Sequence, residues 1–322
     1  MTDLDVLCLG EALVDMLPDR RGALADCERF EAHPGGAPAN VAVGLARLGR
    51  RVAFQGVVGD DPFGEWIARR LSAEGISLHL RRDAAARTGV AFVALDARGE
   101  RSFFSPAREH TADKRLAPAD VDPALVARAR WLHAGLFAHL LPGARDALRA
   151  ALAAARAGGT RVSFDPNVRL YLWDDAADLR RLCDEVLPRC DLVKLSEDEC
   201  ELATGERDPE RAAARLEALG VAIACVTLGE RGALLRHRGR VLRAAAEPVA
   251  VVDTTGAGDG FVAGLLAALA EVEDVRRVDP ARLERALALA TRVAARVCTR
   301  MGAVAGLPRA ADLEPAAGGA AR

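Results

Sequence analysis

A glycine-rich run in the C-terminal half combines an acidic side chain with backbone that could bind an anion. Residues Asp253–Gly260 follow an apolar, strand-like segment and lead into an apolar helix expected over Phe261–Ala270. Backbone N–H groups at a helix start lack intrahelical partners, and the helix dipole is positive there, so the run predicts an anion site. Asp259 would lie beside whatever anion binds there.

Two simpler interpretations of this run exist. Asp259 could act only as an acidic residue of the first helical turn, where the dipole makes it worth about 0.3–1 kcal/mol. The run could also be a dinucleotide-binding loop, but that fingerprint needs a third glycine where this chain has Phe261. The Gly-x-Gly-Asp turn, together with a second glycine-rich segment far away in the chain, favours a functional carboxylate.

The second glycine-rich segment, Pro34–Asn40, precedes a helix expected over Asn40–Leu48. Its two glycines, Gly35 and Gly36, would let a ligand approach the backbone closely. Asn40 could be only the N-cap of the helix, which is a common and sufficient role for asparagine. On its own, this segment is a weak indication of a binding site.

Composition and charge exclude several classes of function. The 322 residues contain 44 Lys+Arg and 46 Asp+Glu, a net charge of −2, without the basic excess of a nucleic-acid binder. We therefore expect no nucleic-acid partner. Lys114 and Lys194 are the only lysines, and neither follows a glycine, which rules out the Gly-Lys-Ser/Thr loop of P-loop NTPases.

The chain also lacks signals for membranes, secretion and transition metals. No stretch approaches the roughly 20 apolar residues that cross a bilayer, and the N-terminus lacks the features of a signal peptide. We therefore expect a cytoplasmic protein with no membrane partner. Seven scattered cysteines without a Cys-x-x-Cys pair indicate incidental thiols, and six dispersed histidines form no metal-binding motif.

Strand-like and helix-like segments alternate along most of the chain, which is typical of a parallel sheet covered by helices on both faces. Asp61-Pro62 and Asp208-Pro209 each indicate an N-cap followed by proline at the first helical position. The expected strands are Leu4–Leu9, Val52–Val58, Trp131–His133, Thr160–Phe164, Asp191–Leu195 and Ala222–Leu228.

One region departs from this alternation. Gly89–Leu95 and Glu100–Phe104 are strand-like and joined by a hairpin turn, and residues 12–34 are irregular to strand-like. These segments predict a small antiparallel excursion, which is either a surface hairpin or a lid over a site. The Ala- and Gly-rich end, residues 314–322, is expected to fray.

Taken together, the two glycine-rich segments resemble the two signatures of the ribokinase/PfkB sugar kinases. Asp165–Arg169 and Val193–Glu199 resemble the fructokinase-like branch in particular, and the likeness runs from Gly10 to Pro308. The resemblance implies a three-layer α/β/α ribokinase-like fold with a mainly parallel central sheet and a small β-sheet lid.

The same resemblance implies how the chain is divided. A single kinase domain would occupy residues 1–313, with the lid formed by 12–34 and 88–113, and a flexible tail would follow at 314–322. A homodimer formed through the lid is a further expectation that comes from the family alone.

The reaction implied by the resemblance is transfer of the γ-phosphoryl group of ATP to a sugar hydroxyl, with Mg²⁺ bridging the phosphates. Asp259 matches the general base, and the backbone amides of Gly256, Ala257 and Gly258 match the anion hole. Arginine can bind a hydroxyl, a phosphate or a carboxylate, or be only a solvated charge, so arginines do not fix the substrate. The implied sugar-binding residues are Asp15, Gly35, Gly36, Asn40, Arg108 and Arg169.

Nucleotide and cation contacts are implied in the same way. The family's Asn-x-x-Glu magnesium motif falls on Ser196–Glu199, where serine replaces the asparagine, so Glu199 is the implied Mg²⁺ residue. Glu199 is expected to act through water. Asp253 and Thr255 match the position at which many relatives bind K⁺. The implied ATP contacts, of which the two glycines could equally be plain turn residues, are Lys194, Thr227, Gly229, Gly232 and Thr291.

Fructose, giving fructose 6-phosphate, is the predicted substrate. A 2-keto-3-deoxygluconate kinase is the nearest alternative, with Arg108 and Arg169 holding the carboxylate, and a ribokinase or nucleoside kinase fits less well. Pro106–Arg108 and Ala134–Phe137 depart from the residues usual in fructokinase-like relatives. An alternative of a different class is a sugar-binding or regulatory module without phosphoryl transfer, against which the intact Gly256–Asp259 turn argues.

Overall fold

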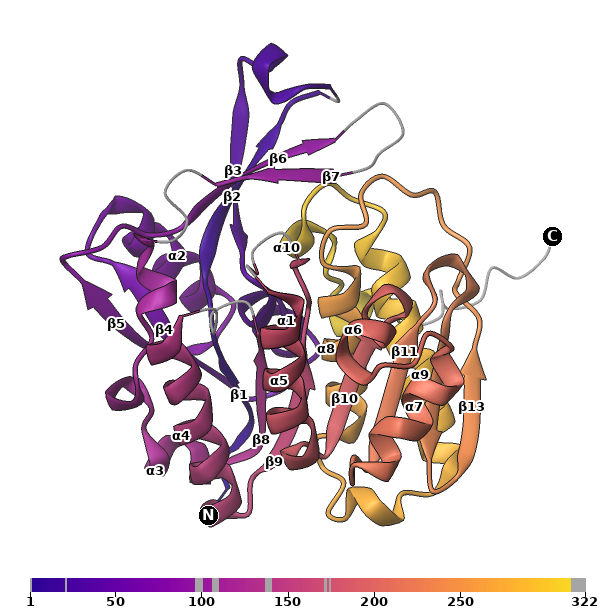
Figure 1. The fold of residues 1–322 in the computed structure, drawn as a ribbon. Coiled ribbons are helices and arrows are strands. Elements are labelled where there is room, and N and C mark those ends of the chain that lie inside the picture. Colours follow the sequence, from indigo (N-terminus) through magenta and orange to yellow (C-terminus); the bar gives the residue numbers. More distant parts are fainter. Residues whose placement is uncertain are drawn as a thin grey trace.

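The computed structural model describes residues 2–20, 22–95, 101–105, 110–136, 141–170, 173 and 175–313. This part of the chain forms a nine-stranded central sheet and a separate four-stranded sheet (Figure 1). The tail predicted to fray, 314–322, lies outside the described residues.

The central sheet has the strand order β13-β12-β11-β10-β9-β8-β1-β4-β5 and is parallel from β11 to β5. At one edge, β12 and β13 add an antiparallel hairpin. All six strands expected from the sequence are present, with ends within two residues of the prediction. The strands are β1 Leu4–Leu9, β4 Val52–Gly59, β5 Ser77–Asp83, β8 Ala129–Gly135, β9 Arg161–Asp165, β10 Leu192–Ser196, β11 Ile223–Thr227, β12 Ala233–His237 and β13 Arg240–Ala244.

Helices cover both faces of this sheet, which confirms the predicted three-layer α/β/α fold (Figure 1). Phe54, Trp131 and Phe261 anchor the buried cluster on one face, and Leu132 and Phe164 anchor the cluster on the other. The first face carries α1 Ala37–Arg47, α2 Pro62–Ala73, α8 Ala257–Leu269 and α9 Pro280–Val297, and the second carries α3 Pro123–Arg128, α4 Pro142–Gly158, α5 Ala176–Val186, α6 Cys200–Thr204 and α7 Pro209–Ala218.

Two helices begin earlier than the sequence indicates. α1 begins at Ala37 instead of Asn40, and α8 begins at Ala257 instead of Phe261. The residues that precede them, Gly36 and Gly256, have φ of +101° and +78°, which glycine adopts without strain. The glycine-rich runs therefore enter the helices, and the polar residues that follow lie in the first helical turns.

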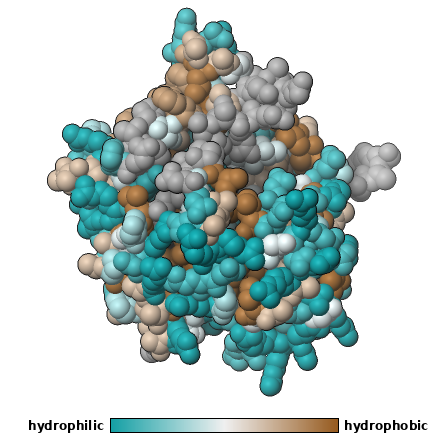
Figure 2. Space-filling model, in the orientation of Figure 1, coloured by the Kyte–Doolittle hydropathy of each residue, from teal (hydrophilic) through white to brown (hydrophobic). Residues whose placement is uncertain are grey.

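The four-stranded sheet has the order β3-β2-β6-β7 and extends beyond the body of the molecule (Figure 1). Two antiparallel pairs, β2–β3 and β6–β7, confirm the predicted excursion, but they join through a parallel β2–β6 pair that was not predicted. Apolar side chains lie on this sheet (Figure 2), and Phe104 is 58% exposed. The strands are β2 Leu13–Pro18, β3 Phe30–Gly35, β6 Val90–Leu95 and β7 Arg101–Phe104.

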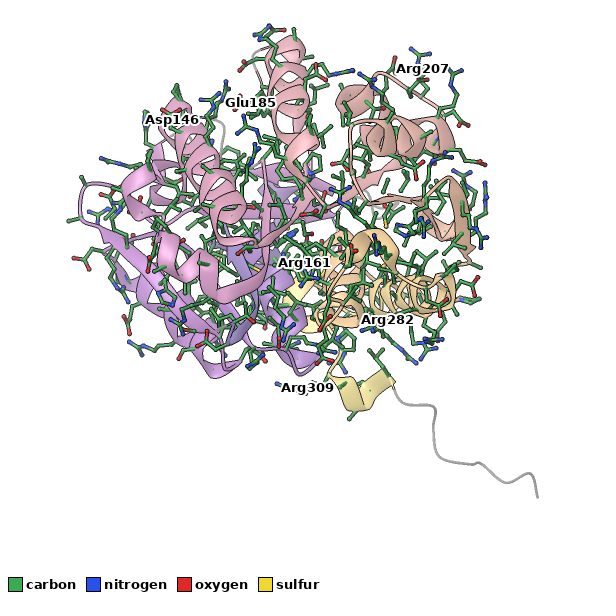
Figure 3. The ribbon with its side chains drawn as sticks, turned by 90° about the horizontal axis from the view of Figure 1, so that it is seen from below. Asp146, Arg161, Glu185, Arg207, Arg282 and Arg309 are labelled. Atoms are coloured by element: carbon green, nitrogen blue, oxygen red, sulfur yellow. The ribbon has the colours of Figure 1, made fainter. Side chains whose placement is uncertain are left out.

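Surface ion pairs link the neighbouring helices α4 and α5. Seen from below, Asp146 on α4 and Glu185 on α5 lie on adjacent helices (Figure 3). Arg149 donates to Asp146 Oδ1 over 2.8 Å and to Glu185 Oε1 over 2.7 Å. Such exposed pairs are worth about 0–1 kcal/mol each, so the helices are held mainly by their buried apolar faces.

The structure also describes the state of the cysteines and the length and polarity of the helices. All seven cysteines are free thiols, as predicted. Within the described ranges, no helix is both long enough and apolar enough to span a bilayer.

Candidate active site

The carboxyl ends of β9, β10 and β11 meet the N-terminus of α8 at one edge of the central sheet (Figure 1). In open α/β sheets, ligands bind in the crevice outside the carboxyl ends of the strands. Two cavities lie there, of about 710 and 360 Å³, and both are lined by Thr227, Thr254 and Gly258. The glycine-rich run Asp253–Gly260 therefore lies between two adjoining cavities.

The glycine turn at the start of α8 shapes the predicted anion site. A Cβ at Gly256 would lie 2.4 Å from the Ala303 side chain, so no other residue fits there. Asp259, the third residue of α8, is only 8% exposed. The predicted anion hole consists of the amides of Gly256, Ala257 and Gly258. The Ala257 N–H donates to the Thr254 carbonyl over a long 3.2 Å, so a bound anion would compete with that carbonyl for this N–H.

Asn40 was interpreted as an N-cap or as a sugar ligand, and the N-cap interpretation is wrong. The cap is Gly36, and the N–H of Ala37, the first helical residue, donates to Glu11 Oε1 over 3.0 Å. Asn40 lies one turn further on, where its Nδ2 donates to Asp259 Oδ2 over 2.8 Å. Its Oδ1 is buried and accepts no hydrogen bond from the described residues. The two glycine-rich segments, 219 residues apart, meet at this bond.

The environment of Asp259 makes it a stronger base than an ordinary aspartate. Burial raises the pKa of Asp259 to about 6 from its ordinary value of 3.8. The Asn40 hydrogen bond lowers this pKa, the negative charge of Asp165 raises it, and the positive charges of Lys194 and Arg169 lower it. A carboxylate of this pKa is ionised at neutral pH and still basic enough to accept a proton, which suits a general base.

Asp15 and the Gly35-Gly36 pair lie together beside this junction. A Cβ at Gly35 would be 2.2 Å from Asp15 Oδ2, and a Cβ at Gly36 would be 2.4 Å from the Glu11 carbonyl oxygen. The double glycine is therefore required so that two acidic residues can approach the backbone. Asp15 is only 9% exposed, so its carboxylate is largely buried at this junction.

The two predicted arginines differ in what the structure describes. Arg169 lines the smaller cavity together with Asp259. Its guanidinium donates to the carbonyls of Asn167 and Val168 over 3.4 and 3.1 Å, which leaves donors available to a ligand. Arg108 lies outside the described residues.

The larger cavity is lined mainly by apolar groups, which suits a flat heterocycle. Thr291 lines it, although its hydroxyl donates to the Ala288 carbonyl of its own helix over 3.0 Å. Gly232 has φ +92°, and a Cβ there would be 2.0 Å from the Ala244 carbonyl oxygen, so the turn also needs glycine for conformational reasons. Other lining residues include Thr227, Gly229, Val249, Phe261, Ala294 and Cys298.

The smaller cavity is polar and lies over a buried cluster of charges. Lys194 Nζ donates to Asp165 Oδ2 over 3.0 Å and lies 3.9 Å from Glu199 Oε2. The two oxygens of Glu199 accept the N–H groups of Val168 and Ser196 over 2.5 and 2.7 Å. Asp165 was not among the predicted site residues. Its position at the carboxyl end of a buried parallel strand is the signal that could have identified it.

Asp253 ties the start of the glycine-rich run to the loop before the short helix α10, Ala303–Gly306. Its Oδ1 accepts hydrogen bonds from the N–H and the hydroxyl of Thr255, over 2.9 and 2.6 Å, and its Oδ2 accepts one from Gly302 N–H over 2.8 Å. Oxygen donors of this kind suit hard cations. In the part of the chain that the structure describes, no group of three or more His, Cys, Asp or Glu could hold a metal ion.

Residues 3–310 match the pfkB family carbohydrate kinases. The chain belongs to the pfkB family of carbohydrate kinases. Both glycine-rich segments, and the strands and helices that bring them together, lie within the matched range.

Relatives within the pfkB family align over nearly the whole chain. The fructokinase of Klebsiella pneumoniae is 44% identical over 310 residues, which cover 95% of this chain and 97% of that protein. The fructokinase of Escherichia coli is 40% identical over 311 residues, 96% of this chain and 98% of that protein.

Solved structures agree with this assignment. The fructokinase of Vibrio cholerae, bound to fructose, ADP and calcium, has a TM-score of 0.84 at 33% identity and covers 96% of this chain and 97% of its own. The aminoimidazole riboside kinase of Salmonella enterica, bound to aminoimidazole riboside and an ATP analog, has a TM-score of 0.81 at 29% identity, with coverage of 96% and 97%. The protein is therefore an ATP-dependent carbohydrate kinase with a ribokinase-like fold, as predicted.

Proposed function

We propose that this kinase phosphorylates fructose, transferring the γ-phosphoryl group of ATP and producing fructose 6-phosphate. The observation that carries the proposal is the junction of Asn40 with Asp259, a buried carboxylate with a raised pKa between a glycine turn and a polar cavity. The choice of fructose over other sugars is supported by the similarity to the Klebsiella pneumoniae and Escherichia coli fructokinases.

In the proposed reaction, Asp259 accepts the proton of the sugar hydroxyl as the hydroxyl oxygen bonds to the γ-phosphorus. The bond from the γ-phosphorus to the bridging oxygen breaks, and ADP leaves with that electron pair. The amides of Gly256, Ala257 and Gly258 donate to the phosphoryl oxygens and stabilise the charge that develops there. The sugar would be held by Asp15, Gly35, Gly36, Asn40, Arg108 and Arg169.

ATP would occupy both cavities, with the adenine in the larger one and the phosphates in the smaller one near Lys194. Mg²⁺, when bound, would neutralise charge on the phosphates. Glu199 would hold this ion through water, because each of its oxygens already accepts a backbone N–H. K⁺ would bind at Asp253 and Thr255. The adenine contacts would be Thr227, Gly229, Gly232 and Thr291.

We also propose that the four-stranded sheet is a lid, formed by residues 12–34 and 88–113 of a kinase domain over 1–313. Closure on sugar should lower protease sensitivity across 88–113, and unchanged sensitivity with and without sugar would count against a lid. The exposed Phe104, at 58% exposure, supports a homodimer formed through this sheet. We propose in addition that the enzyme is cytoplasmic. Sedimentation of the purified protein tests the dimer.

A substrate panel tests the proposed reaction. With ATP and Mg²⁺, kcat/KM is compared for fructose, ribose, glucose and 2-keto-3-deoxygluconate. We expect fructose to exceed the others by about tenfold or more, a range that differential transition-state binding can supply. A highest value for 2-keto-3-deoxygluconate would assign the site to that substrate instead. Absence of turnover with every sugar would contradict the proposal.

A further inference from the structure

Lys194 is unusual in a chain that uses arginine for nearly all of its positive charge. Only two of the 44 basic residues are lysines, and Lys194 is the one that lies beside the polar cavity, with 4% exposure. Lysine carries a compact ammonium with three N–H donors, whereas arginine carries a wide planar guanidinium. A lysine in this position indicates that the site needs the smaller group.

The space around the ammonium explains this requirement. A Cβ at Gly258 would lie 3.0 Å from Lys194 Nζ, so the ammonium lies against the glycine turn itself. Asp165 Oδ2 accepts a hydrogen bond from Nζ over 3.0 Å, and Glu199 Oε2 lies 3.9 Å from Nζ. A guanidinium would have to displace one of these neighbours. Burial lowers the pKa of Lys194, but Asp165 and Glu199 raise it by more, so the ammonium stays charged.

Asp165 is itself fixed in position. It is the last residue of β9 and is 4% exposed. Its Oδ1 accepts the N–H of Asn167 over 3.0 Å, where the chain turns with φ of 44°. Its Oδ2 accepts from Lys194. The carboxylate therefore joins the end of one strand to a side chain of the neighbouring strand.

We propose that Asp165 is a positioning residue, which holds the Lys194 ammonium against the Gly258 turn, where it meets the γ-phosphoryl group during transfer. This inference rests on the proposed kinase reaction. With its bond to Asp165 intact, Lys194 has further N–H groups to donate to phosphoryl oxygens. A charge held in place before ATP binds needs no rearrangement at the moment of reaction.

Asp165 also acts on the general base. The groups that face Asp259 are Asn40 from α1, Lys194 from β10, Asp165 at the end of β9 and Arg169 from the loop that follows. Removing the charge of Asp165 removes a repulsion that favours the protonated form of Asp259. The acid limb of the pH profile should therefore move to lower pH, which a purely structural role would not cause.

Four variants test this arrangement by kcat, KM for ATP, ATP affinity by calorimetry, and the pH profile. We expect Lys194→Met to lose about 10²–10³ in kcat, as for a preorganised donor. Asp165→Asn should lose about tenfold in kcat without weaker ATP binding, because it removes a negative charge near the phosphates. The double variant should be no slower than Lys194→Met. Lys194→Arg should not rescue kcat, although it keeps the charge.

Asp5→Asn is the matched control. Asp5 is 5% exposed, and its carboxylate accepts hydrogen bonds from the Arg51 guanidinium over 3.0 Å and from the Arg51 N–H over 2.9 Å, at the N-terminal end of β1. We expect its kcat and acid limb to match the wild type, even if its melting temperature falls.

The outcomes separate this inference from the proposed function. Wild-type kcat in Asp165→Asn or in Lys194→Arg would overturn the inference, as would an equal shift of the acid limb in Asp5→Asn. The inference would also be overturned if Asp165→Asn lowers kcat by the same factor in the wild type and in the Lys194→Met variant. Should Asp165→Asn fail to fold, the comparison of Lys194→Met with Lys194→Arg carries the test. A wild type that phosphorylates no sugar would contradict the proposed function instead.

Discussion

The amide of Asn40 and the carboxylate of Asp259 share a 2.8 Å hydrogen bond that joins the first turns of α1 and α8. These helices pack closely further along, where a Cβ at Gly44 on α1 would lie 2.7 Å from the Ala263 side chain on α8. The geometry of the bond is therefore set by helix packing and not by a loop. Changes at either residue should act on the chemistry more than on the fold.

Asp259→Asn should retain ATP and sugar binding but lose most of kcat. The amide keeps the size of the carboxylate and cannot accept the hydroxyl proton, and a general base contributes about 10²–10⁴ in rate. Steady-state kinetics gives kcat, and calorimetry with ADP and with fructose gives the two affinities.

Asp279→Asn provides the control for that prediction. Asp279 caps α9 by accepting the Ala281 N–H over 3.0 Å, and asparagine is an equally good cap. The control should behave as the wild type. Near-normal turnover by Asp259→Asn would defeat the assignment of the base.

The pH profile reports the same carboxylate. With a pKa of about 6, Asp259 is protonated and inactive below that pH, so kcat/KM should rise about tenfold per pH unit and level off above it. Asn40→Ala removes a donor that lowers this pKa, so its acid limb should move to higher pH. An acid limb near 4 in the wild type, or an unmoved limb in Asn40→Ala, would contradict this account.

Protein stability should also depend on this group. Because the folded pKa of about 6 exceeds the ordinary value of 3.8, the folded state binds more protons than the unfolded chain between these values. The free energy of unfolding therefore falls as pH rises through this window. At about 1.4 kcal/mol per pKa unit, ionised Asp259 destabilises the fold by up to about 3 kcal/mol above pH 6.

Thermal unfolding of Asp259→Asn checks that sign. The variant should melt at a higher temperature than the wild type at pH 8, and the difference should shrink as pH falls toward 4. An equal difference at both pH values would mean that ionisation of Asp259 does not destabilise the fold.

The strands could be predicted because buried parallel strands are short apolar runs, and β1, Leu4–Leu9, matches its prediction at both ends. The starts of α1 and α8 could not be predicted in the same way. Gly36 and Gly256 enter these helices with positive φ, and the sequence pattern shows that glycine permits this angle without showing that the chain adopts it. For the same reason Asn40 resembled an N-cap.

The sequence led to candidate site residues where they belong to a motif, and it did not lead to Asp165, which belongs to no spaced pattern. Asp259 belongs to a spaced glycine pattern, so a role could be proposed for it before its partner Asn40 was known. Asp165 contacts Lys194, which lies 29 residues further along the chain, only because β9 and β10 are adjacent parallel strands. No local spacing encodes that pairing, and it depends on the order of strands in the sheet.

A dependence on K⁺ is expected from the proposed cation site. Asp253 and Thr255 hold the start of the glycine run, so a cation there would fix the amides that receive the phosphoryl group. Initial rates measured over a range of K⁺ at constant ionic strength should rise severalfold and saturate. Asp253→Asn should lose this activation. Rates that do not respond to K⁺ would leave Asp253 with a structural role only.

Gly35→Ala should damage the sugar side and spare the nucleotide side. The added Cβ would lie 2.2 Å from Asp15 Oδ2, so Asp15 must move, and a displacement of about 1 Å can cost about 10²-fold in kcat/KM for the sugar. ATP affinity should not change. Gly143→Ala, in the first turn of α4, is the matched control, because a Cβ there meets nothing within 4 Å. An unchanged kcat/KM for fructose in Gly35→Ala, or an equal loss in Gly143→Ala, would show that Asp15 does not contribute to sugar binding in the way proposed.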